Sequence, residues 1–264
     1  MNQFGSKKEF LQFAIYIARA AGKKTLDHFK KGVQVDRKDD DSPVTVADRE
    51  AEAWMRERIT EKYPDHGIIG EEYGTVGEQK SVQWILDPID GTQSYIHGVP
   101  LYTTLIGITI DGEPEIGVIY APATDELCDA AVGLGTRFNG HYCKVGNTRS
   151  FRESTLLSTD ITTIYEEGLD QPFNEILKRC RLHRTWGDAY GHMMVAIGRA
   201  DIMFDPLLNI WDAAPLLPIL REAGGVFLDL AGHARIDSGH GFSTNELLAG
   251  EILSILESFP KKTS

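Results

Sequence analysis

Hydrophobic residues recur at helical spacing in two stretches near the start of the chain. Ser6 begins a Ser-Lys-Lys-Glu sequence typical of a capping box, and apolar residues from Phe10 to Ala21 then follow one helical face. This pattern predicts a long first helix that reaches about Lys31. A second helix is predicted from Thr45, which precedes Asp48 by three residues, until Pro64 stops it.

Shorter apolar runs predict strands and a hairpin. HGIIGEE, at 66–72, is typical of a short buried strand that ends in two acidic residues. The β-rich runs at 102–110 and 115–122 flank Asp111-Gly112, and this arrangement predicts a hairpin.

The second half of the chain continues the alternation. The segment 186–204 predicts a helix that ends near Gly198, followed by a strand. The segment 211–225 predicts another helix, with Pro215 in its first turn and Gly224-Gly225 after its end. Alternating helices and strands indicate a layered α/β or α+β arrangement.

Composition and charge argue against some classes of function. The chain has 264 residues, of which 27 are basic and 39 acidic, giving a net charge of −12. That balance argues against nucleic acid as a partner, because phosphate backbones require clustered Lys and Arg. No segment is apolar enough to span lipid, the N-terminus lacks a signal peptide, and three cysteines do not suggest a disulfide framework. We therefore expect a soluble, cytoplasmic protein.

Four acidic residues lie at the ends of predicted elements. Asp87 and Asp90 flank Pro88-Ile89 at the end of a hydrophobic run, Glu71 lies at the end of the strand at 66–72, and Asp212 follows Trp211 at the start of the predicted helix. Each alone has an ordinary explanation as a turn or helix-cap residue. The pair in LDPIDGT is less easily explained in this way, because Pro88 restricts the segment and a tight turn can direct both carboxylates to one point.

Converging carboxylates predict a cation site. Two unit charges ~4 Å apart repel by roughly 4 kcal/mol at an effective dielectric near 20. Because of this repulsion, converging carboxylates either have raised pKa values or bind cations. Oxygen ligands, including the Ile89 carbonyl, favour Mg²⁺, Mn²⁺ or Ca²⁺ over zinc. Gly91-Thr92 follow at once, where backbone N–H groups at a helix start would bind phosphate. Together these features indicate two-metal phosphoryl hydrolysis, with Thr92 orienting the water.

Four motifs in order resemble the inositol monophosphatase superfamily of magnesium-dependent, lithium-sensitive phosphatases. They are VTVAD (44–48), GEE (70–72), DPIDGT (87–92) and WDAA (211–214), the last followed by EAGG. The resemblance implies a layered αβαβα sandwich in the α+β class, a homodimer, and two or three Mg²⁺ per site, with Mn²⁺ as an alternative. It further implies one phosphatase domain over 1–264, with the metal site in a half at about 1–147 and the substrate pocket completed by 148–264.

The same resemblance assigns roles to individual residues. Asp48 and Thr92, together with Glu71, would position and activate the attacking water, and the segment Asp90-Gly91-Thr92 would hold the phosphate. Lys38 would correspond to a lysine in the family's mobile metal loop. The metal ligands would be Glu71, Asp87, the Ile89 carbonyl, Asp90 and Asp212.

The substrate is a small phosphate ester, and its identity depends on residues further along the chain. Within the superfamily, TWGDAYG (185–191) is most similar to the histidinol-phosphate phosphatase branch. Histidinol phosphate carries an ammonium and an imidazole, so its pocket should offer carboxylates, and Asp188 and Asp205 fall where the family contacts substrate. A helix N-cap is the alternative for Asp188. His97, His183, Arg184 and His192 are weaker candidates for the site.

Other functions stay open at this point. The nearest alternative is an inositol monophosphatase or a broad-specificity sugar-phosphate phosphatase. A non-catalytic metal- or phosphate-binding module is a further alternative, although it would not require both Thr92 and Asp48.

Overall fold

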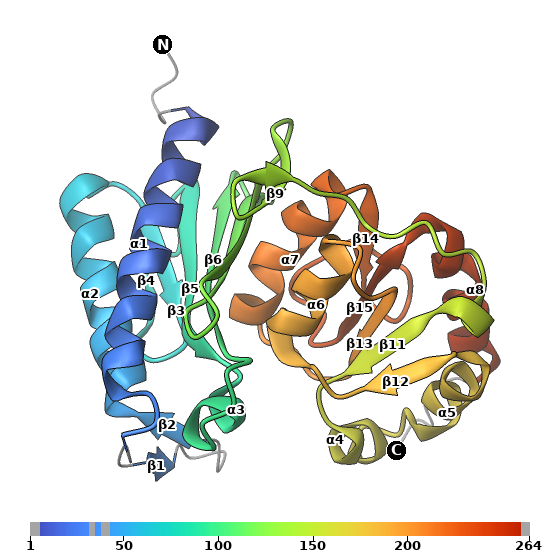
Figure 1. Ribbon diagram of the computed structural model, residues 1–264. Helices are drawn as coiled ribbons and strands as arrows, with labels where there is room; N and C mark the ends of the chain where they lie inside the picture. Colours follow the sequence, from blue (N-terminus) through green and yellow to red (C-terminus); the bar gives the residue numbers. More distant parts are fainter. Residues whose placement is uncertain (1–5, 32–34, 38–42, 260–264) are drawn as a thin grey trace.

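Two large β-sheets form the framework of the protein (Figure 1). The computed structural model describes residues 6–31, 35–37 and 43–259. From one edge to the other, the eight-stranded sheet consists of β10 (His141–Tyr142), β9 (Gly135–Phe138), β8 (Glu126–Ala131), β7 (Glu113–Ala121), β6 (Thr103–Ile110), β5 (Val82–Asp90), β3 (Gly67–Gly70) and β4 (Gly74–Val76). Only the pairing of β3 with β5 is parallel in this sheet.

The second sheet has five strands in the order β12 (Leu182–Arg184), β11 (Thr155–Ser158), β13 (Ile202–Asp205), β15 (Gly241–Asn245) and β14 (Gly225–Leu228). Strand β11 pairs in parallel with both its neighbours, and the remaining pairs are antiparallel. A separate two-stranded sheet joins β1 (Val35–Arg37) to β2 (Pro43–Thr45).

Helices cover the sheets in three layers. One face of the larger sheet packs against α1 (Lys7–His28) and α2 (Val46–Lys62). Between the two sheets lie α6 (Asp188–Ala196) and α7 (Ile210–Glu222). The far side of the smaller sheet is covered by α5 (Asp170–Arg179) and α8 (Glu246–Ser258) (Figure 1). The short helices are α3 (Thr92–Ile96), α4 (Ile161–Glu166) and the 3₁₀ turn η1 (Phe151–Glu153). This is the αβαβα sandwich in the α+β class that the sequence predicts.

Both N-terminal helices form as predicted, with one difference in length. The first ends at His28 rather than near Lys31, because Lys30 has a φ of +62°, which does not continue a right-handed helix. At its start, the Ser6 hydroxyl accepts a hydrogen bond from the Glu9 amide. The second begins with the Thr45–Asp48 capping box that the spacing predicts.

The predicted hairpin is confirmed: β6 and β7 pair antiparallel about Asp111-Gly112. Both turn residues have positive φ, +52° and +87°, as a type I′ turn requires.

Helix α7 packs directly on the larger sheet through two glycines. Gly107 and Gly117 are paired across β6 and β7, and a Cβ on Gly117 would lie 2.1 Å from the Pro215 carbonyl oxygen. The prediction that Pro215 occupies the first turn of this helix is wrong. The helix begins at Ile210, because the Asn209 amide donates to the Asp212 carboxylate at that end, so both Pro215 and Pro218 lie inside it.

No helix in the described part of the chain is long and apolar enough to cross a membrane. Its cysteines are free: Cys128 is buried, while Cys143 and Cys180 are half-buried.

Candidate metal and phosphate site

Three carboxylates converge where β5 meets the start of α7. Asp87, Asp90 and Asp212 each place an oxygen within 4.8 Å of the others. Asp212 is in the first turn of α7, and the two other aspartates lie at the end of β5. The structure therefore brings together three of the predicted metal ligands.

A β-bulge explains how two aspartates three positions apart reach the same point. In a regular strand, residues i and i+3 point to opposite faces. Here Asp87 pairs with Leu105 and Asp90 with Thr103, so two residues on β5 face the single residue Thr104 on β6. The Thr104 hydroxyl donates to the Pro88 carbonyl at 2.9 Å and holds the bulge. The extra residue returns Asp90 to the face that Asp87 occupies.

Burial and mutual repulsion raise the pKa of each of these carboxyls well above its usual value. For Asp87, burial is the largest cause, followed by the charges of Glu71, Asp90 and Asp212. For Asp90, the charge of Asp188 comes next after burial, and for Asp212 the charge of Asp90 does. Buried acids that share a site in this way favour either protons or a cation, and a set of oxygen donors fits a hard divalent ion.

Glu71 adjoins this trio through Asp87. It follows β3 directly, and its amide donates to the Leu86 carbonyl at 3.2 Å, which continues the parallel pairing of β3 and β5 by one residue. The Glu71 side chain hydrogen-bonds the Asp87 carboxyl and raises its pKa. This placement is compatible with the predicted role of Glu71 as a fourth carboxylate ligand.

The turn after β5 is built around Gly91. Its φ is +79°, in the left-handed region, and a Cβ there would lie 2.9 Å from the Asp188 carboxylate. The Thr92 hydroxyl donates to the Ile89 carbonyl at 3.1 Å, which leaves that oxygen a second lone pair for a cation. The conformation of this turn therefore requires glycine at position 91, and phosphate binding by Gly91-Thr92 stays a prediction.

Asp48 lies near the same carboxylates from α2. Burial, opposed by hydrogen bonds from Thr45, raises its pKa to about 6, and the charge of Glu71 contributes. In the described part of the chain its carboxylate accepts bonds from the Thr45 amide and hydroxyl and makes no direct bond to Thr92. The role of Asp48 behind Thr92 stays a prediction.

Two more acidic residues extend the cluster: Asp188 at the start of α6 and Asp205 at the end of β13. The Asp188 amide donates to the Thr159 hydroxyl at 2.8 Å, and that hydroxyl donates to the Asp205 carboxylate at 2.9 Å. Burial and the charge of Asp205 raise the pKa of Asp188 to about 7. Gly187, not Asp188, occupies the N-cap of α6, and the Ala189 amide next to Asp188 donates to Asp90 at 3.0 Å. Asp188 therefore lies between the metal cluster and Asp205.

His192 is a buried residue that sequence reasoning left among the weak candidates. Its Nδ1 lies 2.6 Å from the Ser243 hydroxyl, and its Nε2 faces Asp205 at 3.9 Å. The spacing of His192 on α6, four residues after Asp188, is the signal that would have placed it on the same side of the helix.

Arg184 and His97 make local contacts, to the His183 and Gln93 carbonyls, whereas the His183 Nε2 lies 2.9 Å from the Ser158 hydroxyl. Lys38 lies outside the described residues.

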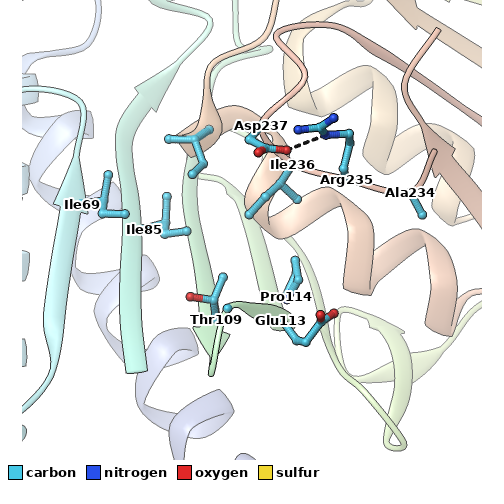
Figure 2. A pocket seen from close by; sticks show the side chains of 11 residues that line it. Ile69, Ile85, Thr109, Glu113, Pro114, Ala234, Arg235, Ile236 and Asp237 are labelled. Carbon is cyan, nitrogen blue, oxygen red and sulfur yellow. Dashed lines mark hydrogen bonds and ion pairs between the residues drawn. The ribbon is translucent and has the colours of Figure 1, made fainter. Parts of the chain in front are cut away.

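A pocket of about 330 Å³ is lined by residues of β3, β5 and the β6–β7 hairpin together with the segment 234–237 (Figure 2). Ile69 and Ile85 in its wall precede Glu71 and Asp87 by two residues. Its rim carries the Arg235–Asp237 ion pair. None of the predicted ligands lines this pocket, so the pocket and the acidic cluster are separate features.

The sandwich and the acidic cluster fit a metal-dependent phosphatase, and comparison with known proteins gives the family. Residues 6–258 match the model of the inositol monophosphatase family, so the chain belongs to that family.

Individual relatives refine this assignment. The chain is 40% identical to a histidinol-phosphatase from Chlorobaculum parvum over 93% of its length and 96% of the relative's. It is 33% identical to Nus factor SuhB from Pasteurella multocida, covering 94% and 95%. A solved inositol monophosphatase from Anabaena (Nostoc) superposes with a TM-score of 0.84 at 28% identity, covering 96% and 97% of the two chains.

Proposed function

We propose that this phosphatase hydrolyses histidinol phosphate to histidinol and phosphate in a Mg²⁺-dependent reaction. The observation that carries the specificity is the position of two carboxylates, Asp188 and Asp205, beside the metal cluster. The Thr159 hydroxyl links the Asp188 backbone amide to the Asp205 carboxylate, and the two carboxylates are well suited to an ammonium and an imidazole. Similarity to a histidinol-phosphatase supports the same substrate.

We propose that two or three Mg²⁺ would be held by Glu71, Asp87, the Ile89 carbonyl, Asp90 and Asp212; the convergence of Asp87, Asp90 and Asp212 supports a cation site there. Divalent cations, when bound, supply Lewis acidity and lower the pKa of water. The amides of Gly91 and Thr92 bind the phosphate oxygens. Thr92 orients the attacking water, with Asp48 as the acceptor behind it. Because Asp48 has a pKa of about 6, it is available as a base near neutral pH.

Asp188 and Asp205 then orient the alcohol portion of the substrate. Ion pairs with the substrate ammonium and imidazole would hold the phosphate ester in line with the Gly91-Thr92 turn, because the Asp188 carboxylate lies 2.9 Å from where a Cβ on Gly91 would be. A neutral polyol has no positive charge to pair with these two carboxylates, so it would bind them only through hydrogen bonds that its hydroxyl groups donate. We further propose a cytoplasmic homodimer.

The alternatives are an inositol monophosphatase, a broad-specificity sugar-phosphate phosphatase, and a non-catalytic metal-binding module. Purified protein should be assayed with histidinol phosphate and inositol 1-phosphate side by side, with Mg²⁺ and with a chelator. We expect a higher kcat/KM for histidinol phosphate and no turnover in the chelator.

A tenfold or greater preference for inositol phosphate would contradict the specificity. Binding of metal without turnover of any phosphate ester would favour the non-catalytic module. Light scattering on the same sample tests the dimer.

A further inference from the structure

A buried ion pair on α2 lies behind the predicted metal site and is not part of it. Glu52 is fully buried and accepts a hydrogen bond of 2.7 Å from the Arg56 guanidinium, one turn further along the helix. Full burial of a carboxylate costs free energy unless the group is paired and hydrogen-bonded. The remaining contacts of Glu52 therefore indicate its role.

Those contacts all go to the turn between β3 and β4. The Glu52 carboxylate accepts the backbone N–H of Glu72 at 2.7 Å and that of Tyr73 at 3.2 Å. Arg56 donates to the Gly74 carbonyl at the other end of the turn. The ion pair thus holds a three-residue turn, and Glu71 is the first residue of that turn.

Gly70 shows how closely the pair approaches this backbone. A Cβ at Gly70 would lie 2.1 Å from the Glu52 carboxylate. On the sheet side, Gly70 pairs with Leu86, and the Glu71 amide also donates to Leu86. The backbone around Glu71 is therefore fixed on one side by β5 and on the other by α2, and in this arrangement the Glu71 side chain interacts with Asp87.

Charge makes this arrangement suitable beside an acidic centre. Because Glu52 is neutralised by Arg56, the pair orders the turn without adding net negative charge to the cluster of carboxylates. A buried carboxylate without such a partner would increase the repulsion that already raises the pKa of Asp87.

We propose that Glu52 is a positioning residue for the metal site, acting through the amides of Glu72 and Tyr73 to place the Glu71 carboxylate beside Asp87. This inference rests on the proposed metal site and is independent of which phosphate ester is hydrolysed. Substitution of a residue that orients a metal ligand typically lowers metal affinity 10–100-fold.

The test is a Mn²⁺-binding titration of the full chain, followed by electron paramagnetic resonance, for wild type and Glu52→Gln. The glutamine keeps the shape of the side chain, but its NH₂ group cannot accept a hydrogen bond, so it cannot serve both amides and Arg56. We expect Mn²⁺ affinity to fall about tenfold or more. At saturating metal, KM for the substrate should stay unchanged. Glu57→Gln is the matched control, because Glu57 is an exposed acid on the same helix that pairs with Arg58, and it should bind Mn²⁺ as wild type does.

Wild-type Mn²⁺ affinity in Glu52→Gln, with or without a loss of thermal stability, would overturn the proposal. If that variant does not fold, Arg56→Lys replaces it: lysine keeps the charge but cannot bridge Glu52 and Gly74 as the guanidinium does. Arg56→Lys should weaken Mn²⁺ binding severalfold, and unchanged affinity would again contradict the inference. Absence of phosphatase activity in the wild type would refute the proposed function and leave this binding test intact.

Discussion

Replacing Asp87 by Asn should have opposite effects on the metal-free and the metal-bound protein. Asp87 is 2% exposed and contributes an oxygen to the acidic trio. The asparagine carbonyl can still accept the hydrogen bond that the Ile89 amide donates to Asp87 at 2.9 Å. The substitution therefore removes a charge and leaves the local backbone supported.

The magnitude follows from the separation of the oxygens. At 4.8 Å, two unit charges repel by about 3.5 kcal/mol at an effective dielectric of roughly 20. Asp87 has two such neighbours in the trio, but raised pKa values mean that bound protons already relieve much of this repulsion. We expect the metal-free variant to gain about 1–2 kcal/mol in the free energy of unfolding, a rise in Tm of about 2–8 °C.

Differential scanning calorimetry in chelator and in saturating Mg²⁺ measures both effects. The wild type should gain stability from Mg²⁺, by about 2.7 kcal/mol at a concentration 100 times the Kd, whereas Asp87→Asn should lose this gain and its turnover. The matched control is Asp129→Asn, which removes a buried carboxyl whose pKa burial raises to about 6 and which lies outside the cluster. That control should keep both the Mg²⁺ response and activity. A lower metal-free Tm for Asp87→Asn combined with an intact Mg²⁺ response would refute the reasoning.

Three further predictions follow from the fold and the site. Gly117→Ala should lower the free energy of unfolding by about 1–3 kcal/mol, measured by urea titration, because the new methyl would clash with Pro215; an unchanged midpoint would contradict this packing. Asp188→Asn should lower kcat/KM about tenfold for histidinol phosphate and much less for inositol phosphate, since a single charged hydrogen bond contributes about 1.5–3 kcal/mol; equal losses would remove its role in specificity. The pKa values of about 6 for Asp48 and about 7 for Asp188 lie above the unfolded value of 3.8, so the unfolded chain loses these protons first. Metal-free stability should therefore decrease between pH 4 and about pH 7, and saturating Mg²⁺ should reduce that decrease; a Tm in chelator that is independent of pH over this range would contradict it.

Local sequence patterns predict most of the elements and the convergence of the acids. The Asp111-Gly112 turn, the Thr45 capping box and the helix before Gly198 are each determined by residues close together in the chain. The carboxylates of DPIDGT could also be predicted to converge, because Pro88 restricts the strand end where the bulge forms.

Contacts between distant segments explain what the patterns missed. The close packing of α7 on the larger sheet at Pro215 depends on Gly117, which lies far earlier in the chain. Glu52 and Arg56 have the i, i+4 spacing of an ordinary helix-surface ion pair, and only the fold shows that both are turned toward the β3–β4 turn.

The position of bound metal tests the central claim most directly. Crystals of the protein soaked in Mn²⁺ should show anomalous scattering peaks among the oxygens of Glu71, Asp87, Asp90 and Asp212, with metal–oxygen distances of about 2.0–2.3 Å. These peaks should disappear in Asp87→Asn. A Mn²⁺-soaked wild-type crystal without a peak at these carboxylates, or with ordered metal only elsewhere, would contradict the assignment of this cluster as the catalytic metal site.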